Sequence, residues 1–189
     1  YLSTNIMGIT DGQIVFDLGY FRKGIRPAVN AGLSVSRVGG QAQTKRQKRL
    51  STALFKSLAK YRQAEEFSHF SSQLSKETKR DLTLGKHLYI ALQQPPDQLF
   101  SLVEQQLMLE TIMLPDDDRA INVAGLKEAV KQRSAEAKTE EDYDRIEREL
   151  LEQFGAQVLV ETPALPNPED QLADQDKKAD DKHKKEKKK

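Results

Sequence analysis

The segment QTKRQKRLSTALFKSLAKYR, residues 43–62, marks the point at which the chain changes from strand-like to helical sequence. Its apolar residues recur at spacings of four and three, in the order Leu50, Leu54, Leu58 and Tyr61. This spacing places them on one face of a helix. Such a face is stable when it packs against other elements, so the segment predicts one member of a helical bundle.

The first turns of this expected helix are basic, with Lys45, Arg46, Lys48 and Arg49 close together. The amino end of a helix carries partial positive charge and favours acidic residues instead. The basic turns therefore predict a partner, which is either an acidic surface or a bound phosphate. A solvated charged face explains the pattern equally well.

The sequence beyond this segment predicts four more helices, which makes residues 43–154 a helical bundle. The expected helices are Lys76–Leu92 with Ser75 as N-cap, a helix introduced by Gln94-Pro95-Pro96-Asp97 that runs through Leu99 to Ile112, one near 119–133 capped by Asp118, and one at about 140–154 with the capping box of Thr139 and Asp142.

Residues 1–42 are rich in glycine and β-branched residues and lightly charged. We expect short strands at Asn5–Ile9 and Gln13–Phe16 around the turn Thr10-Asp11-Gly12. Two strands alone are marginally stable in water. We therefore expect an α+β fold in which these strands end a larger sheet, and a chain that is the C-terminal part of something longer.

Residues 155–189 predict a disordered charged tail, because 163–189 consist of Pro, Asp and Lys with almost no apolar side chains. A solvated spacer is the simpler interpretation. A weak contact with an anionic surface is the alternative.

The overall composition excludes several classes of function. The 30 Lys and Arg residues nearly balance the 29 Asp and Glu residues, which argues against nucleic-acid binding through bulk charge. The chain has no Cys, which excludes disulfides, thiolate catalysis and zinc–thiolate sites. No apolar run approaches the roughly 20 residues that span a bilayer.

The usual catalytic arrangements are also missing. His69, His87 and His183 do not fall at metal-ligand spacing with carboxylates, so we expect no metal ligands. His69 and His87 are expected at helix surfaces or boundaries. No phosphate-binding loop is present, because Gly85-Lys86 is followed by His in a helical context. Motif chemistry alone therefore leaves a helical domain without an assigned function.

The segment KGIRPAVNAGLSVSRVG, residues 23–39, gives a more specific indication. It closely resembles the α subunit of F-type ATP synthase. The similarity includes Ile9-Thr-Asp-Gly-Gln-Ile14 and Ala59-Lys-Tyr-Arg62, is dense over about the first 70 residues, and continues in pattern to about residue 113. The catalytic β subunit carries different residues around the equivalent of Ser36 and Arg37.

The resemblance implies a fold and a complex. Residues 1–42 would be the end of a RecA-like α/β nucleotide-binding domain, and 43–154 the C-terminal helical bundle that follows it. In this family α and β subunits alternate in an α3β3 ring around the γ central stalk, with δ at the peripheral stalk. Proton flow drives ATP synthesis at the β sites. The α subunit binds ATP or ADP with Mg²⁺ that is not turned over.

Two expectations about the chain itself follow from the resemblance. The isolated chain is not expected to be catalytic, because catalysis belongs to the complex. It is expected to reach the membrane only through that complex, as a peripheral protein on the cytoplasmic side of a bacterial membrane. An organellar inner membrane is the alternative.

The resemblance also implies roles for four residues. Arg37 matches an arginine finger that projects into the neighbouring β site, where a planar, permanently cationic guanidinium stabilises the charge of the transferring phosphoryl group. Arg26 and Pro27 match an Arg-Pro pair that lies against the adenine of the α-bound nucleotide. Gln94 matches one of two Gln residues that border this base. The simpler interpretations are a salt-bridged arginine, a turn proline and a helix-ending glutamine.

The sequence departs from the family pattern at three places. Gly8 replaces a Ser that lies near the catalytic phosphate, and Pro96 replaces the second Gln beside adenine. The acidic loop that approaches the rotor reads Ser71-Ser-Gln-Leu-Ser-Lys-Glu77. These departures favour an uncoupled paralogue of the α subunit or a non-enzymatic helical interaction module. The intact Ser-Val-Ser-Arg-Val-Gly run favours the α subunit more, and a nucleic-acid-binding helix at Thr44–Arg49 has little support.

Overall fold

The structure is a computed structural model that describes residues 2–68, 74–95, 98–115 and 119–156. This part of the chain is mostly helical, with short strands that form two antiparallel pairs, β1 with β2 and β3 with β4. The elements in chain order are α1 Leu2–Ile9, β1 Gly12–Gln13, α2 Leu18–Arg22, β2 Val35–Ser36, α3 Gly39–Ala42, α4 Lys45–Ser68, α5 Lys76–Leu92, α6 Leu102–Met113, β3 Ala120–Ile121, α7 Val123–Arg133, a 3-10 turn Ser134–Glu136, α8 Glu140–Phe154 and β4 Gly155–Ala156.

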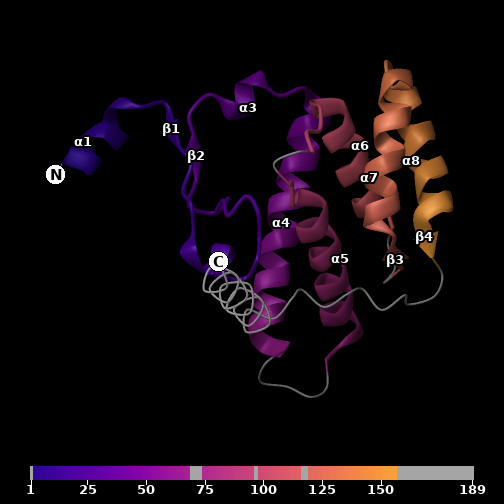
Figure 1. The fold of residues 1–189 in the computed structure, drawn as a ribbon, viewed down its shortest axis with the longest axis horizontal. Coiled ribbons are helices and arrows are strands. Elements are labelled where there is room, and N and C mark those ends of the chain that lie inside the picture. Colours follow the sequence, from indigo (N-terminus) through magenta and orange to yellow (C-terminus); the bar gives the residue numbers. More distant parts are fainter. Residues whose placement is uncertain (1, 69–73, 96–97, 116–118, 157–189) are drawn as a thin grey trace, which may run out of the picture.

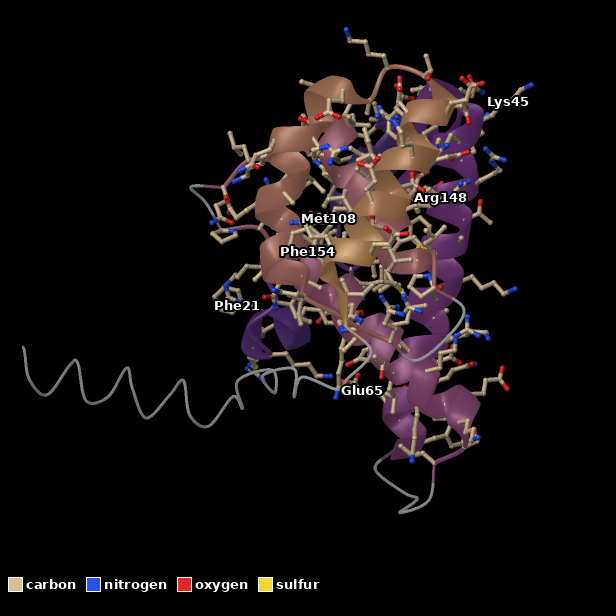
Figure 2. The ribbon with its side chains drawn as sticks, turned by 90° about the vertical axis from the view of Figure 1, so that its right-hand side faces the viewer. Phe21, Lys45, Glu65, Met108, Arg148 and Phe154 are labelled. Atoms are coloured by element: carbon tan, nitrogen blue, oxygen red, sulfur yellow. The ribbon has the colours of Figure 1, made fainter. Side chains whose placement is uncertain are left out.

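The bundle is formed by α4 to α8, and each helix contributes an apolar face to one core. The long helix α4 lies along α5, and α6, α7 and α8 complete the bundle on one side of this pair (Figure 1). Met108 lies inside the bundle, whereas Lys45 and Glu65 lie toward opposite ends of α4 (Figure 2). The most deeply buried apolar side chains are those of Leu88, Leu107, Ile112, Leu126, Val130, Ile146 and Leu150.

Helix caps determine where the helices begin. As predicted, α5 begins after Ser75, whose hydroxyl accepts the Thr78 amide at 3.1 Å. The predicted capping box of Thr139 and Asp142 starts α8. Both predictions are confirmed because these local hydrogen bonds satisfy backbone donors that a helix leaves unpaired.

Two of the predicted helix starts were wrong. The third helix begins after Ser101, which forms a capping box with Glu104, so Leu99 lies outside it. The fourth begins after Asn122, whose side chain accepts the Gly125 amide, because Ala120–Ile121 pair as β3 with β4. The expected cap Asp118 and most of the predicted tail lie outside the described residues.

The strand predicted at Asn5–Ile9 was also wrong, because this segment belongs to helix α1. No strand in the described part of the chain lies beside it, so its backbone groups pair within the segment, and the Thr10 amide continues this pattern to the Ile6 carbonyl at 3.1 Å. Of the second predicted strand, Gly12–Gln13 pairs with Val35–Ser36, and Phe16 forms an isolated bridge to Val29. Helix α1 and the β1–β2 pair extend to one side of the bundle (Figure 1).

His87 is buried in α5 rather than placed at a helix surface or boundary, so that prediction was wrong. The side chain is 2% exposed, and its Nε2 accepts the Ile121 amide at 3.4 Å. Burial lowers the pKa of His87, which keeps the imidazole neutral. The ring therefore acts as a buried hydrogen-bond acceptor between α5 and β3, a role that helical periodicity does not reveal.

Arg46 explains the basic first turn of α4. Its guanidinium, 12% exposed, contacts Glu110 of α6 at 2.9 Å and Glu147 of α8 at 2.5 Å. The same group contacts Asp144 at 2.8 Å and Glu140 at 3.4 Å. The partner predicted for the basic residues is thus an acidic surface of the chain itself, and it ties α4 to α6 and α8.

We expect Arg46→Met to destabilise the fold by about 3 kcal/mol, because it leaves the largely buried Glu110 carboxylate without its cation and Glu147 without its hydrogen-bond donor. Arg49→Met is the matched control. Arg49 is 75% exposed, and its one ion pair among the described residues is with Glu140, at 3.8 Å, so its loss should change stability by less than about 0.5 kcal/mol. Urea unfolding of both variants measures the difference. Equal stabilities would contradict a structural role for Arg46.

Glu147 is buried and lies close to both Glu110 and Arg46. Burial, together with the adjacent Glu110, raises the pKa of Glu147 to about 8, and Arg46 opposes this shift. Between the ordinary glutamate range and this value the folded state holds a proton that the unfolded state has released. Stability therefore falls as pH rises through this interval.

We expect the free energy of unfolding to decrease between pH 7 and 8, by at most about 1.4 kcal/mol per pH unit. His87 does not oppose this trend, because its lowered pKa places its titration below the interval. Urea unfolding across the interval measures the slope. Glu147→Gln should flatten it, whereas exposed Glu141→Gln should leave it unchanged. An identical slope in Glu147→Gln would contradict the assignment.

Gly85 allows α4 and α5 to approach each other closely. A Cβ atom at this position would overlap the side chain of Tyr61, whose ring lies 5.2 Å from that of Tyr89.

Alanine normally favours a helix by about 1 kcal/mol relative to glycine. We nevertheless expect Gly85→Ala to destabilise the fold by about 1–3 kcal/mol, measured by thermal unfolding. Gly40→Ala, with nothing within 4 Å of its Cβ, should be neutral or slightly stabilising.

Candidate functional site

Arg37 follows strand β2 at the edge of the small β1–β2 pair. Its backbone amide donates to the Asp11 carbonyl at 2.9 Å, which fixes the main chain. The guanidinium is exposed and makes one long contact, from Nη2 to the Gly8 carbonyl at 3.5 Å. Among the described residues no carboxylate lies within ion-pair distance of it. The backbone is therefore held while the cationic group stays available to an external anion.

The loop that leads to Arg37 is organised by Asn30, which is buried. Its side-chain oxygen accepts the Gly32 amide at 3.1 Å, and its amide nitrogen donates to Asp17 at 2.9 Å. The hydrogen bonds from Asn30 and from the Gly19 amide lower the pKa of Asp17. Ser34 closes the loop by donating to the Asn30 carbonyl at 2.7 Å. This network determines the direction in which the chain enters β2.

Arg26, Pro27 and Gln94 come together although they lie far apart in the sequence. The Gln94 amide, just beyond α5, donates to the Arg26 carbonyl at 2.9 Å. The Arg26–Pro27 peptide bond is cis, and both side chains are exposed. One small region thus presents a stiff apolar ring, a guanidinium and an amide.

Phe21 of α2 belongs to the same region, and sequence reasoning missed it. The Arg26 guanidinium lies over its ring at 3.7 Å and donates to the Phe21 carbonyl at 2.7 Å. The ring is half exposed and lies at the periphery of the molecule (Figure 2). An aromatic face, a planar cation and a proline ring suit a flat heteroaromatic base. The region therefore presents exposed flat faces of this kind close together.

The four predicted site residues form two separate groups. Arg26, Pro27 and Gln94 are connected through the hydrogen bond between Gln94 and Arg26. Arg37 contacts Asp11 and Gly8 instead and joins none of them. The described residues also contain no group of three acidic or histidine side chains arranged to hold a metal ion.

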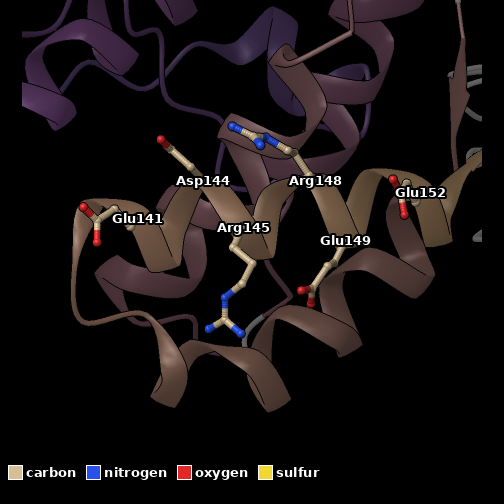
Figure 3. A pocket seen from close by; sticks show the side chains of 6 residues that line it. All are labelled: Glu141, Asp144, Arg145, Arg148, Glu149 and Glu152. Atoms are coloured by element: carbon tan, nitrogen blue, oxygen red, sulfur yellow. The ribbon is translucent and has the colours of Figure 1, made fainter.

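The outer face of α8 forms a different surface. Figure 3 shows a hollow lined only by charged side chains of that helix: Glu141, Asp144, Arg145, Arg148, Glu149 and Glu152. Its volume is about 390 Å³. Two basic side chains lie between two acidic pairs along the face, a mixture of charges that is typical of a solvated helix surface. Across the described segments no helix combines the length and the apolar character needed to cross a membrane.

Comparison with known proteins gives these sites a context. The chain is 50% identical over 105 residues to ATP synthase subunit alpha of Petrotoga mobilis, a match covering 56% of this chain and 21% of that protein. It is 47% identical over 109 residues to ATP synthase subunit alpha of Lawsonia intracellularis, covering 58% of this chain and 22% of that protein. The matched stretch thus spans about a fifth of the length of these relatives.

A solved structure has a similar fold. It is described as a unique ATP synthase subunit, NeqB, from Nanoarcheaum equitans, and the likeness has a TM-score of 0.56. It covers 60% of this chain and 31% of that chain at 24% identity, a level at which only the fold is compared. The likeness supports the mostly helical architecture described above.

The strongest evidence for a family lies in the bundle. Residues 43–149 match the protein family described as ATP synthase alpha/beta chain, C terminal domain, which accounts for more than half of the chain. The resemblance to the α subunit noted in the sequence is thereby confirmed, and this chain belongs to the ATP synthase alpha/beta C-terminal domain family.

Proposed function

We propose that the chain acts as part of an ATP synthase α subunit and that Arg37 is the arginine finger of a neighbouring β-subunit catalytic site. The observation that carries this proposal is that Arg37 has a fixed backbone and an available guanidinium. Its backbone is fixed to Asp11, while its guanidinium is exposed and has no carboxylate partner among the described residues. An arginine with a structural ion pair would instead be occupied within its own chain.

The chemical role follows from charge. Negative charge spreads over the phosphoryl oxygens in the transition state of ATP synthesis or hydrolysis. A guanidinium supplied by a neighbouring subunit can stabilise this charge with two parallel hydrogen bonds. In general such a finger changes the rate by about 10³–10⁵. Arg37 thus contributes to turnover in a site that the chain alone does not contain.

The second part of the proposal concerns nucleotide binding by the α subunit itself. Arg26 and Pro27 would lie against the adenine of a bound ATP or ADP, and Gln94 would border its edge. The proximity of these residues and the arginine over Phe21 support this assignment. Mg²⁺ would accompany the nucleotide phosphates, and we place none of its ligands in this chain. The bound nucleotide would regulate the complex without being turned over.

The remaining elements of the proposal concern assembly. Residues 1–42 would complete a RecA-like nucleotide-binding domain, 43–154 would form the helical part of an α3β3 ring, and 155–189 would be a charged tail. The partners would be β subunits, the γ stalk and δ with the peripheral stalk. The complex would couple a proton gradient to ATP synthesis, with this subunit peripheral on the cytoplasmic side of a membrane.

We expect Arg37→Lys to reduce multisite ATP hydrolysis at least about 100-fold in α3β3γ complexes whose α subunits carry this sequence, because lysine keeps the charge but loses the planar fork. Assembly and nucleotide binding should be preserved. The measurement compares steady-state kcat with the binding of a fluorescent adenine nucleotide. Arg22→Lys, an exposed arginine at the end of α2, is the matched control.

The outcome separates two functions. A collapse of kcat with intact assembly supports the finger. An unchanged kcat in an assembled complex would contradict it and would favour an uncoupled paralogue that keeps the fold as an interaction module.

A further inference from the structure

Lys127 on α7 occupies an unusual position. Its ammonium group donates to the backbone carbonyl of Gln93 at 2.6 Å and lies 5.9 Å from the ring of Phe100. The side chain is half buried, and no carboxylate in the described segments forms an ion pair with it. Lys131, one turn later, also lies over the Phe100 ring, at 5.0 Å, but it pairs with Glu128 at 3.8 Å.

Burying the ammonium group of Lys127 costs free energy, and the hydrogen bond to the Gln93 carbonyl offsets part of this cost. Burial lowers the pKa of Lys127, because desolvation disfavours the ammonium form. Gln93 is the residue that ends α5, and its backbone is extended, so its carbonyl is turned out of the helical hydrogen-bond pattern. The hydrogen bond from Lys127 satisfies this carbonyl, so Lys127 connects α7 to the end of α5 and is not a solvated surface lysine.

The Gln93 carbonyl belongs to a peptide group that also makes a second hydrogen bond, through its amide. The carbonyl of Gln93 and the amide of Gln94 lie in one planar group, since the peptide bond resists rotation. The Gln94 amide of that group donates to the Arg26 carbonyl at 2.9 Å. A hydrogen bond that orients the carbonyl of this planar peptide group therefore also orients its amide toward Arg26.

We propose that Lys127 is a positioning residue that holds the Gln93–Gln94 peptide plane and thereby sets the Arg26–Pro27 loop against Gln94. The arrangement connects α7 of the bundle to the loop that follows α2. The consequence for nucleotide binding rests on the base site proposed above. The mechanical connection does not, because it consists of two hydrogen bonds within the chain.

The connection is tested first without nucleotide, by amide hydrogen exchange of the 189-residue chain. In Lys127→Met we expect the Gln94 amide to exchange about tenfold faster, since a charge-assisted bond to its peptide is lost. Lys131→Met is the matched control and should leave this amide unchanged. Lys127→Arg, which retains a cationic donor, should restore part of the protection.

Hydrogen exchange of a core amide distinguishes a local effect at Gln94 from a loss of global stability. The exchange of Gln94 is compared with that of Leu107, which lies in the centre of the bundle. Faster exchange at Gln94 with Leu107 unchanged supports the proposal. Equal acceleration of both amides, or none at Gln94, overturns it.

The second test uses α3β3γ complexes whose α subunits carry this sequence and measures the affinity for a fluorescent adenine nucleotide at the α sites. Lys127→Met should weaken it about three- to tenfold. Arg26→Ala is the reference for the base site itself. If Arg26→Ala weakens binding but Lys127→Met does not, the positioning role is wrong. If Arg26→Ala has no effect, the proposed base site fails, while hydrogen exchange still decides the connection.

Discussion

The bundle depends on a half-buried arginine that faces an excess of carboxylates. Arg46 joins α4 to Glu110 of α6 and Glu147 of α8, so three helices share one electrostatic contact. Removing a cation from such a cluster leaves uncompensated charge in a region of low polarity. The excess of carboxylates also places a proton on the cluster near neutral pH, since burial and Glu110 raise the pKa of Glu147. The same helix α4 packs along α5, where Tyr61 lies against Gly85.

Local signals predicted the bundle well, whereas signals that depend on a distant partner did not. The caps Ser75 and Thr139 start their helices as expected, because a side chain within the same turn satisfies the free amides. Ala120 and Ile121 were assigned to a helix because their strand partner, Gly155–Ala156, lies far along the chain. Residues 5–9 have strand-like composition but form a helix, since no strand in the described part of the chain lies beside them.

The candidate site shows the same division. The sequence pattern could not predict that Gln94 contacts Arg26, because nothing local connects the end of α5 to the loop after α2. Only the family resemblance suggested that these residues share a site. Phe21 was missed because an exposed aromatic residue in a short helix carries no distinctive pattern. Lys127 was missed for a physical reason as well. A lysine on an amphipathic helix is normally solvated, and its contact with Gln93 depends on how α7 packs beside α5.

The two proposed functional groups rest on different kinds of support. Arg37 follows the two-residue strand β2, and the Asp11 carbonyl holds its backbone. Its exposed side chain can therefore adapt to a neighbouring subunit. The base site is attached to the bundle, because the Gln93–Gln94 peptide receives a bond from α7 and gives one to Arg26. A movement of α7 relative to α5 therefore changes the base site directly, whereas it reaches Arg37 only through the intervening loop. Nucleotide binding at the base site would, by the reciprocity of coupled equilibria, stabilise the bundle arrangement that binds it best.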